Sequence, residues 1–246
     1  MDVVGVIPAR YASTRLEGKV LADICGKPMI QHVWERARQS RLLDELLVAC
    51  DDERVAAAVK KFGGKAVMTA KAHTCGTDRI AEAVYPLDVK VVVNIQADEP
   101  LLHAMMIDQV AQALLQDSSL PMATLAKRIE EENEINDPNV VKVIFDRNSL
   151  AVYFSRAAIP YRAANSEVRA AAYYKHIGMY GYSKDFLFTY KNMPPSTLEK
   201  TEKLEQLRVI EAGYRIKVLE TRYETISVDT AEDLLRVKAA MEATAK

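Results

Sequence analysis

Near its N-terminus the chain reads VVGVIPARYASTRLEGK (residues 3–19), a short apolar run followed by a polar, basic loop. Residues 3–7 are mostly Val and Ile and end at Pro8, which is typical of a strand buried on both faces of a sheet. A helical spacing of apolar residues follows at 29–38. The stretch therefore predicts the first strand of a sheet whose strands are joined by helices.

The same alternation of strand and helix continues through the first half of the chain. Further strands are expected at 45–50, 65–68 and 90–95, and further helices at 51–62, 77–84 and 104–116. Asp51 and Thr77 are expected to cap two of these helices, and Gly63 is expected to end the first. Repeated strand–helix units imply an α/β fold with a mostly parallel sheet covered on both faces.

The second half of the chain is less regular. Strands are expected at 122–129, 140–146, 151–155, 176–182 and 216–220, and helices at 185–191, 198–212 and 230–241. Residues 159–172 are polar, basic and irregular, which fits either a mobile loop or an arm that pairs with another subunit. Because no repeat and no Gly/Ser linker interrupts the chain, we expect residues 1–246 to form a single domain with an inserted or appended subregion.

Composition excludes several classes of protein. The chain has 246 residues, 33 Lys+Arg against 34 Asp+Glu, and 49% apolar residues, which argues against a disordered chain and against a general nucleic-acid binder. No apolar run is long enough to span a membrane. The three cysteines form no CxxC pair, and no secretory signal pattern is present, so we expect a cytoplasmic protein without a zinc site.

The loop after the first strand is a candidate polyanion site. It carries Arg10, Ser13, Arg15 and Lys19 at the carboxyl end of a parallel strand, where open α/β sheets bind their ligands. Cations placed this close together fit a ligand such as a triphosphate. The P-loop pattern is absent, and a solvated basic loop is the alternative interpretation.

Carboxylates follow another predicted strand, in the segment NIQADEP (94–100). Asp98 at this sheet edge is suited to Mg²⁺, which prefers oxygen ligands and phosphate oxygens. Asp229 is a candidate second ligand. The alternatives are an acidic cluster before a helix for Asp98 and an ordinary helix N-cap for Asp229.

Polar side chains in the second half are candidates for binding an acidic, hydroxylated substrate. Arg156, Lys175 and His176 could bind a carboxylate, whereas Tyr180, Glu205 and Gln206 could form hydrogen bonds with hydroxyl groups. The alternatives are a structural histidine and the solvated face of an amphipathic helix.

Together these segments resemble the 3-deoxy-manno-octulosonate cytidylyltransferase family, also called CMP-KDO synthetases. The motifs occur in the family's order along nearly the whole chain, which makes the set far more specific than any one of them. They are IPARYASTRLEGK (7–19), GKPMIQHV (26–33), DDERV (51–55), GTDRI (76–80), NIQADEP (94–100), VKVIFD (141–146), YFSRAAIP (153–160), KHIGMYGY (175–182), LEQLRVIEAG (204–213) and VDTAEDL (228–234).

The resemblance implies a nucleotide-diphospho-sugar-transferase-like three-layer sandwich with a small β-rich dimerisation subregion. Residues 1–125 would form the nucleotide-binding half, and 126–246 the sugar-binding and dimer-forming part of a homodimer. The implied enzyme would use Mg²⁺ to join CTP and KDO into CMP-KDO and pyrophosphate, for lipopolysaccharide synthesis.

The resemblance also implies roles for individual residues. The nucleotide contacts would be Pro8, Ala9, Arg10, Ser13, Arg15, Lys19, Gly76, Thr77, Arg79, Gln96 and Asp98. The Mg²⁺ ligands would be Asp98 and Asp229, which with Arg15 and Lys19 make up the catalytic set. The sugar contacts would be Arg156, His176, Tyr180, Glu205 and Gln206.

Three positions depart from the family's usual pattern. Ala97 replaces a glycine, Cys75 stands where serine is common, and Glu17 replaces a frequent proline. These changes bear on nucleotide affinity, because a methyl group at 97 would crowd an approaching ligand or restrict a positive φ. The alternatives are the same reaction on 8-amino-KDO or another acidic sugar such as a sialic acid, and a non-catalytic binding module.

Overall fold

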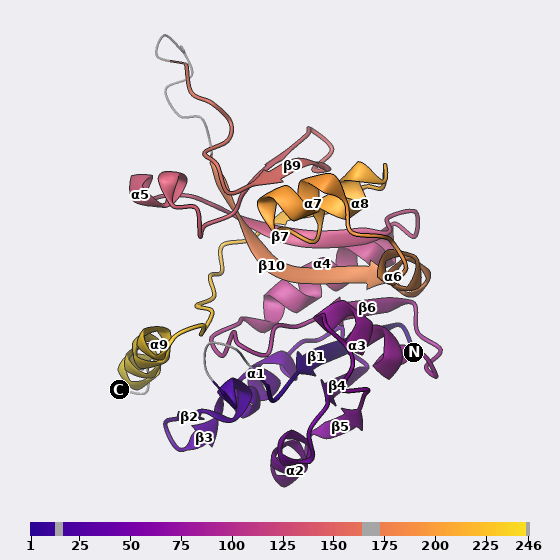
Figure 1. The fold of residues 1–246 in the computed structure, drawn as a ribbon, viewed down its shortest axis with the longest axis vertical. Helices are drawn as coiled ribbons and strands as arrows, with labels where there is room; N and C mark the ends of the chain where they lie inside the picture. Colours follow the sequence, from indigo (N-terminus) through magenta and orange to yellow (C-terminus); the bar gives the residue numbers. More distant parts are fainter. Residues whose placement is uncertain (13–16, 164–172, 245–246) are drawn as a thin grey trace.

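The computed structural model describes residues 1–12, 17–163 and 173–244, and its centre is a nine-stranded sheet. Seven strands lie side by side in the order β11-β7-β10-β6-β1-β4-β5, and β8 joins β10 to β9. Figure 1 shows the run from β7 through β10, β6, β1 and β4 to β5. Their bounds are β1 Val3–Ala9, β4 Glu45–Cys50, β5 Lys65–Met68, β6 Val91–Asn94, β7 Met122–Arg128, β8 Lys142–Phe145, β9 Ala151–Ser155, β10 Tyr174–Ser183 and β11 Ile216–Glu220.

The strand pairs are parallel except for those that β10 makes with its neighbours and the pair of β8 with β9. β1 pairs in parallel with both β4 and β6, β4 with β5, and β7 with β11, whereas β10 runs antiparallel to β6 and β7. The Val-rich sequences of β1 and β6 are buried, as expected of strands covered on both faces. The predicted mostly parallel sheet is confirmed.

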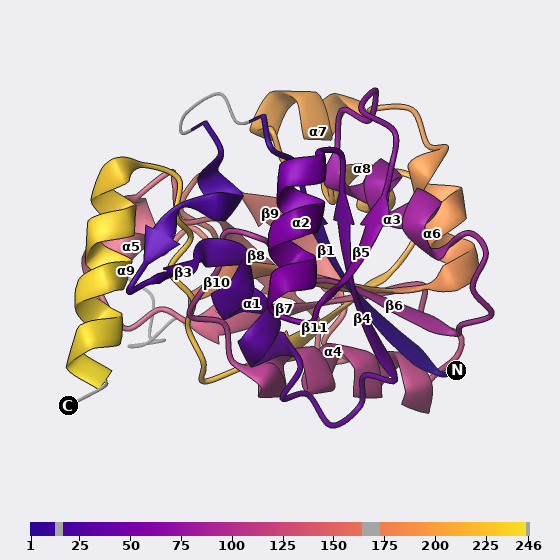
Figure 2. The ribbon, with the colours of Figure 1, turned by 90° about the horizontal axis from the view of Figure 1, so that it is seen from below.

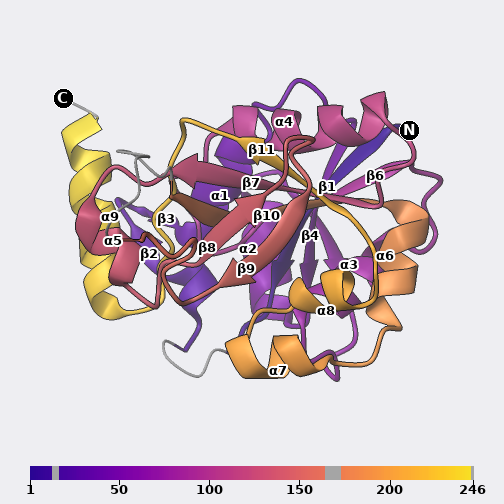
Figure 3. The same cartoon turned by 90° about the horizontal axis from the view of Figure 1, so that it is seen from above.

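Helices cover both faces of the sheet and make the fold a three-layer sandwich. On one face α1 (Met29–Ala37), α2 (Glu53–Lys61) and α4 (Ala104–Gln116) pack onto one apolar core. On the other face α3 (Gly76–Val84), α6 (Lys184–Lys191) and α8 (Leu207–Glu211) pack onto a second core. Figures 2 and 3 show α4 on one side of the sheet and α6 and α8, with the short α7 (Thr197–Glu202), on the other.

A peripheral unit completes the fold. The helix α9 (Ala231–Thr244) lies at the end of the molecule beside the short strands β2 (Asp23–Ile24) and β3 (Lys27–Pro28), which follow the 3-10 turn Lys19–Leu21 (Figure 2). A small third core joins these elements, and its buried members are Ile24, Met29, Val228 and Val237. Residues 221–230 connect β11 to α9 in an extended path, so α9 is attached to the sheet through a strap.

The predicted helix at 198–212 is wrong, because the chain forms two helices there. Lys203 ends α7 in a left-handed conformation with φ of 57°, and α8 begins only at Leu207. Two predicted caps are also displaced by one or two residues: Asp52 rather than Asp51 caps α2, and Cys75 rather than Thr77 caps α3. The strands β2 and β3 and the short helix α5 (Glu132–Asn136) were not predicted from the sequence.

Other expected elements agree with the structure. The bounds of β4, β5, β9, β11 and α4 are those expected, and Gly63 and Gly213, each with φ of 81°, follow α2 and α8. The irregular stretch 159–172 lies partly outside the described residues, so the expected arm stays a prediction. Among the described residues no helix is both long and apolar enough to cross a membrane.

Candidate active site

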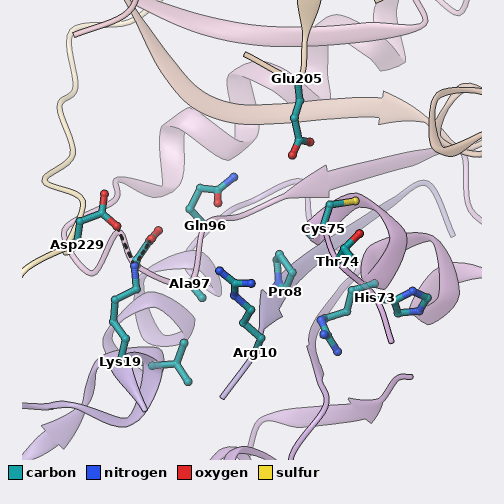
Figure 4. Close-up of a pocket in the computed structure, with 14 residues that line it drawn as sticks. Pro8, Arg10, Lys19, His73, Thr74, Cys75, Gln96, Ala97, Glu205 and Asp229 are labelled. Atoms are coloured by element: carbon teal, nitrogen blue, oxygen red, sulfur yellow. Dashed lines mark hydrogen bonds and ion pairs between the residues drawn. The ribbon is translucent and has the colours of Figure 1, made fainter. Parts of the chain in front are cut away.

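Two adjoining cavities open at the carboxyl ends of β1 and β6. The first has a volume of about 320 Å³, and the second about 390 Å³. Both are lined by Pro8, Gly76, Gln96, Asp98 and Glu205. The first is also lined by Arg10, Lys19, Val20, His73, Thr74, Cys75, Arg79, Ala97 and Asp229 (Figure 4). The shared wall makes the two cavities parts of one site at the sheet edge where α/β folds bind ligands.

Lys19 brings two aspartates that are far apart in the sequence to one point. Its Nζ lies 2.7 Å from Oδ2 of Asp98 and 3.2 Å from Oδ1 of Asp229 (Figure 4). The backbone is also tied here, since the N–H of Val228 donates to the carbonyl of Asp98 over 2.9 Å. The carboxylates of Asp98 and Asp229 therefore face a common point at the wall of the first cavity.

This pair of carboxylates fits a divalent cation that also binds phosphate. In the described part of the chain no group of three or more His, Cys, Asp or Glu side chains could hold a metal. Mg²⁺ in phosphate-transfer sites is commonly held by one or two carboxylates, with water and substrate phosphates as the other ligands. Asp98 and Asp229 supply such a pair, and the adjoining cavity leaves space for a phosphate.

The other basic residues predicted to contact the nucleotide differ in whether they face the cavity or are bound within the protein. Arg10 lines the first cavity, whereas Ser13 and Arg15 lie outside the described residues. Arg79 is only 3% exposed and donates to Oγ1 of Thr69 over 2.6 Å and to Oδ2 of Asp51 over 2.9 Å. Arg10 and Lys19 are thus the described cations best placed for an anion in the first cavity.

Asp51 connects Arg79 to the basic loop. Oδ1 of Asp51 accepts a hydrogen bond from the backbone N–H of Tyr11 over 3.1 Å, and Tyr11 stacks against the guanidinium of Arg54, 3.5 Å from the ring centre. Gly18, with φ of 65°, closes the loop by donating to the carbonyl of Tyr11 over 3.2 Å. Arg79 therefore supports the loop through Asp51.

The positions that depart from the family pattern have distinct surroundings. Sγ of Cys75 accepts from the N–H of Asp78 at 3.4 Å, and burial raises the pKa of the thiol to about 11, so it stays protonated at neutral pH. Ala97 is not among the described residues with positive φ, so its methyl group causes no backbone strain of that kind. The methyl group instead lies in the wall of the first cavity, and Glu17 is exposed.

The structure places the predicted nucleotide residues at different depths. Gly76 opens α3 against Pro8, and a Cβ on Gly76 would lie 3.5 Å from that proline ring, an ordinary contact. Ala9 is fully buried in the core beneath the loop and is not among the residues lining either cavity. Thr77 lines the second cavity, and Nε2 of Gln96 donates to the carbonyl of Gly178 over 3.0 Å.

The second cavity gathers four of the five predicted sugar residues, which are His176, Tyr180, Glu205 and Gln206. Burial lowers the pKa of His176 to about 3, and its Nε2 lies 3.0 Å from Oγ1 of Thr124. His176 is therefore neutral at physiological pH and cannot offer a positive charge to a carboxylate. Burial also raises the pKa values of Tyr180 and Glu205.

Buried polar atoms without partners concentrate at the second cavity. Four such side-chain atoms occur in the described ranges, and three belong to residues that line this cavity: Oδ1 of Asn94, Oε2 of Glu99 and Nε2 of Gln206. An unpaired buried polar group is costly, and a hydroxylated ligand would supply the missing hydrogen bonds. Asn94 was not predicted as a site residue, although it begins the segment NIQADEP (94–100).

Arg156 is the predicted sugar residue that the structure does not bring to the others. Its Nε donates to the carbonyl of Glu202 over 2.9 Å, its Nη1 to the carbonyl of Pro138 over 2.9 Å, and it lines neither cavity. The ammonium of Lys175 is likewise engaged, by the carboxylates of Glu134 and Glu224. Both cations hold parts of the protein together in this chain.

Comparisons with known proteins show which family the chain resembles over nearly its whole length. The family model described as "Cytidylyltransferase" matches residues 4–218. A Syntrophus aciditrophicus protein named 3-deoxy-manno-octulosonate cytidylyltransferase is 54% identical over 96% of both chains, and one of that name from Geotalea uraniireducens is 51% identical over 96% of this chain and 98% of its own. A CMP:2-keto-3-deoxy-manno-octonic acid synthetase complexed with CTP matches with a TM-score of 0.93 and 43% identity, over 99% of this chain and 100% of that one.

Proposed function

The chain belongs to the cytidylyltransferase family, and from this premise we infer that it transfers CMP from CTP to KDO and releases pyrophosphate. One observation carries the proposal: Asp98, held by Lys19, lines both cavities. The first cavity also presents Arg10, and residues of the second hold three buried polar atoms that have no partner in the described part of the chain. A nucleotide in the first cavity and a sugar in the second would meet at Asp98. The names of the relatives and the CTP complex of the similar structure support the same assignment.

The first cavity suits the nucleotide. Arg10 and Lys19 would pair with triphosphate oxygens, and Ser13 and Arg15 are proposed to complete this loop. Pro8 and Gly76 line the same cavity and would contact the nucleotide there.

The second cavity suits KDO, a sugar acid with several hydroxyl groups. Gln206 and Asn94 each present an unpaired polar atom, and Glu205 lines both cavities, so these side chains would bind and select hydroxyl groups. His176, being neutral, would act as a hydrogen-bonding group. The sugar carboxylate would then depend for charge neutralisation on Lys203, which lines this cavity, on Arg10 or Lys19 in the first cavity, or on cations outside the described residues.

In the proposed reaction the anomeric hydroxyl oxygen of KDO forms a bond with the α-phosphorus of CTP while the bond from that phosphorus to pyrophosphate breaks. The hydroxyl proton passes to solvent, so no dedicated general base is required. Lys19 and Arg10 would stabilise the charge that develops on the phosphoryl oxygens and on pyrophosphate. Mg²⁺, held by Asp98 and Asp229, would neutralise phosphate charge and lower the pKa of the attacking hydroxyl.

We also propose a cytoplasmic homodimer that supplies activated KDO for lipopolysaccharide synthesis. KDO in the names of the relatives supports this role, and neither a nucleic acid nor a membrane is proposed as a partner.

The test is pyrophosphate release from the purified protein, with each of the four nucleoside triphosphates against KDO, 8-amino-KDO and a sialic acid, with and without Mg²⁺. We expect release with CTP and KDO in the presence of Mg²⁺. A faster rate with 8-amino-KDO or the sialic acid would reassign the sugar, and CTP binding without any release would indicate a non-catalytic binding module.

A further inference from the structure

Asp233 organises the turn that presents Asp229 to the site. One oxygen of its carboxylate, Oδ2, accepts hydrogen bonds from the backbone N–H of Asp229 at 3.1 Å, and from the N–H and the hydroxyl of Thr230, both at 2.9 Å. The N–H of Asp233 donates in return to Oγ1 of Thr230 over 3.2 Å. This reciprocal arrangement is a capping box at the start of α9. The arrangement includes one more bond than a capping box requires, from the N–H of Asp229. This bond fixes the backbone of the proposed metal ligand.

The rest of α9 holds this turn against the segments that carry the other members of the site. Val237 is buried with Ile24 and Val228 in the third core. Ile24 lies shortly after the turn that carries Lys19, and Val228 is bonded through its N–H to the carbonyl of Asp98. The docking of α9 therefore joins the three short segments on which Lys19, Asp98 and Asp229 lie.

We propose that Asp233 is a positioning residue, which together with the docking of α9 directs the Asp229 carboxylate toward Asp98 and so sets the affinity of the site for a divalent cation. This inference rests on the proposed function, because it assigns Asp229 to the metal. Asp233 itself points to the backbone of Asp229 and Thr230, so it acts through its neighbour. Groups that orient a metal ligand typically change metal affinity about 10- to 100-fold when removed.

The test measures metal binding without turnover. The dissociation constant of Mn²⁺ is determined by electron paramagnetic resonance on the CTP-loaded protein without sugar, and thermal unfolding is followed in parallel. Asp233→Ala should weaken Mn²⁺ binding about tenfold or more. Asp233→Asn, which keeps an oxygen acceptor, should stay within about threefold of the wild type. CTP binding in EDTA should be unchanged in both variants.

A control separates positioning from simple helix capping. Ser183 caps α6 by accepting from the N–H of Phe186 over 3.3 Å, and it lines neither cavity. Ser183→Ala should lower the melting temperature by a few degrees, as a lost cap does, without changing Mn²⁺ affinity. A similar loss of melting temperature in Asp233→Ala with unchanged Mn²⁺ affinity would overturn the proposal.

Two more variants make the result decisive. Val237→Ala leaves the capping box in place but loosens the docking core, so it should also weaken Mn²⁺ binding, and it carries the test if Asp233→Ala does not fold. Unchanged affinity in that variant would exclude a role for docking. If Asp229→Ala weakens Mn²⁺ binding and Asp233→Ala does not, the positioning inference fails alone. If Asp229→Ala has no effect, the metal assignment in the proposed function fails with it.

Discussion

Replacing Lys19 gives the sharpest test of the site, because this side chain separates two carboxylates that would otherwise repel each other. Its Nζ lies 2.7 Å from Asp98 and 3.2 Å from Asp229, and the three side chains are 13%, 26% and 37% exposed. Exposed ion pairs contribute about 0–1 kcal/mol, whereas breaking a buried pair costs about 3–5 kcal/mol. For these partly buried pairs we expect Lys19→Met to lower the free energy of unfolding by about 1–3 kcal/mol in EDTA, measured by urea denaturation.

The same substitution should change metal affinity and turnover in opposite directions. Without the ammonium group of Lys19, a divalent cation no longer has to displace it from Asp98 and Asp229. If the ion pairs of Lys19 oppose the cation by about 1.4 kcal/mol, their loss strengthens Mn²⁺ binding to the nucleotide-free protein about tenfold. Pyrophosphate release should fall about 10²- to 10³-fold, because a positive charge near the reacting phosphate is lost.

Lys27 provides a matched control. Its Nζ pairs with Glu35 at 2.8 Å on the surface, where the two side chains are 46% and 36% exposed. Lys27→Met should cost less than about 1 kcal/mol and leave Mn²⁺ affinity unchanged. If Lys19→Met kept full stability and bound Mn²⁺ more weakly than the wild type, the placement of Lys19 between the two carboxylates would be refuted.

Three further predictions concern the two cavities. Asp98→Asn should lower pyrophosphate release at least about 10³-fold while circular dichroism stays native, because a neutral amide cannot hold the cation; near-normal rates with Mg²⁺ would contradict this. Glu205→Ala should raise the KM for KDO more than that for CTP, and equal changes would argue against a sugar contact. Burial lowers the pKa of His176 from 6.5 to about 3. Between these two pH values the unfolded state binds a proton at His176 that the folded state does not, so the free energy of unfolding falls as the pH drops from 6.5 to about 3. His176→Asn should lose less stability in acid urea titrations than the wild type, and identical losses would contradict the assignment.

Most of the fold could be predicted because its signals are local. The apolar runs of β4, β5 and β11 and the periodicity of α4 lie within single segments, and their bounds agree with the structure. The division of 198–212 could not be predicted in this way. It depends on Lys203 adopting a left-handed conformation, which is uncommon for a lysine and is not indicated by the helical spacing around it.

The site was harder to predict than the fold. The meeting of Asp98 and Asp229 came from the family resemblance, since no spacing rule relates residues so far apart. Arg156 was expected to contact the sugar, but its guanidinium donates hydrogen bonds to the carbonyl groups of Glu202 and Pro138. Asn94 was overlooked because an amide at a strand end has no pattern of its own; only its unpaired oxygen in the folded chain distinguishes it.

The placement of α9 has a consequence for heat inactivation. This helix belongs to neither of the two large cores and is secured mainly by the small one around Val237. Elements with few buried contacts open at lower free energy than the central sheet. On warming, Asp229 should therefore leave the site while the sheet is still intact. Activity would then be lost, and regained on cooling, several degrees below the calorimetric transition.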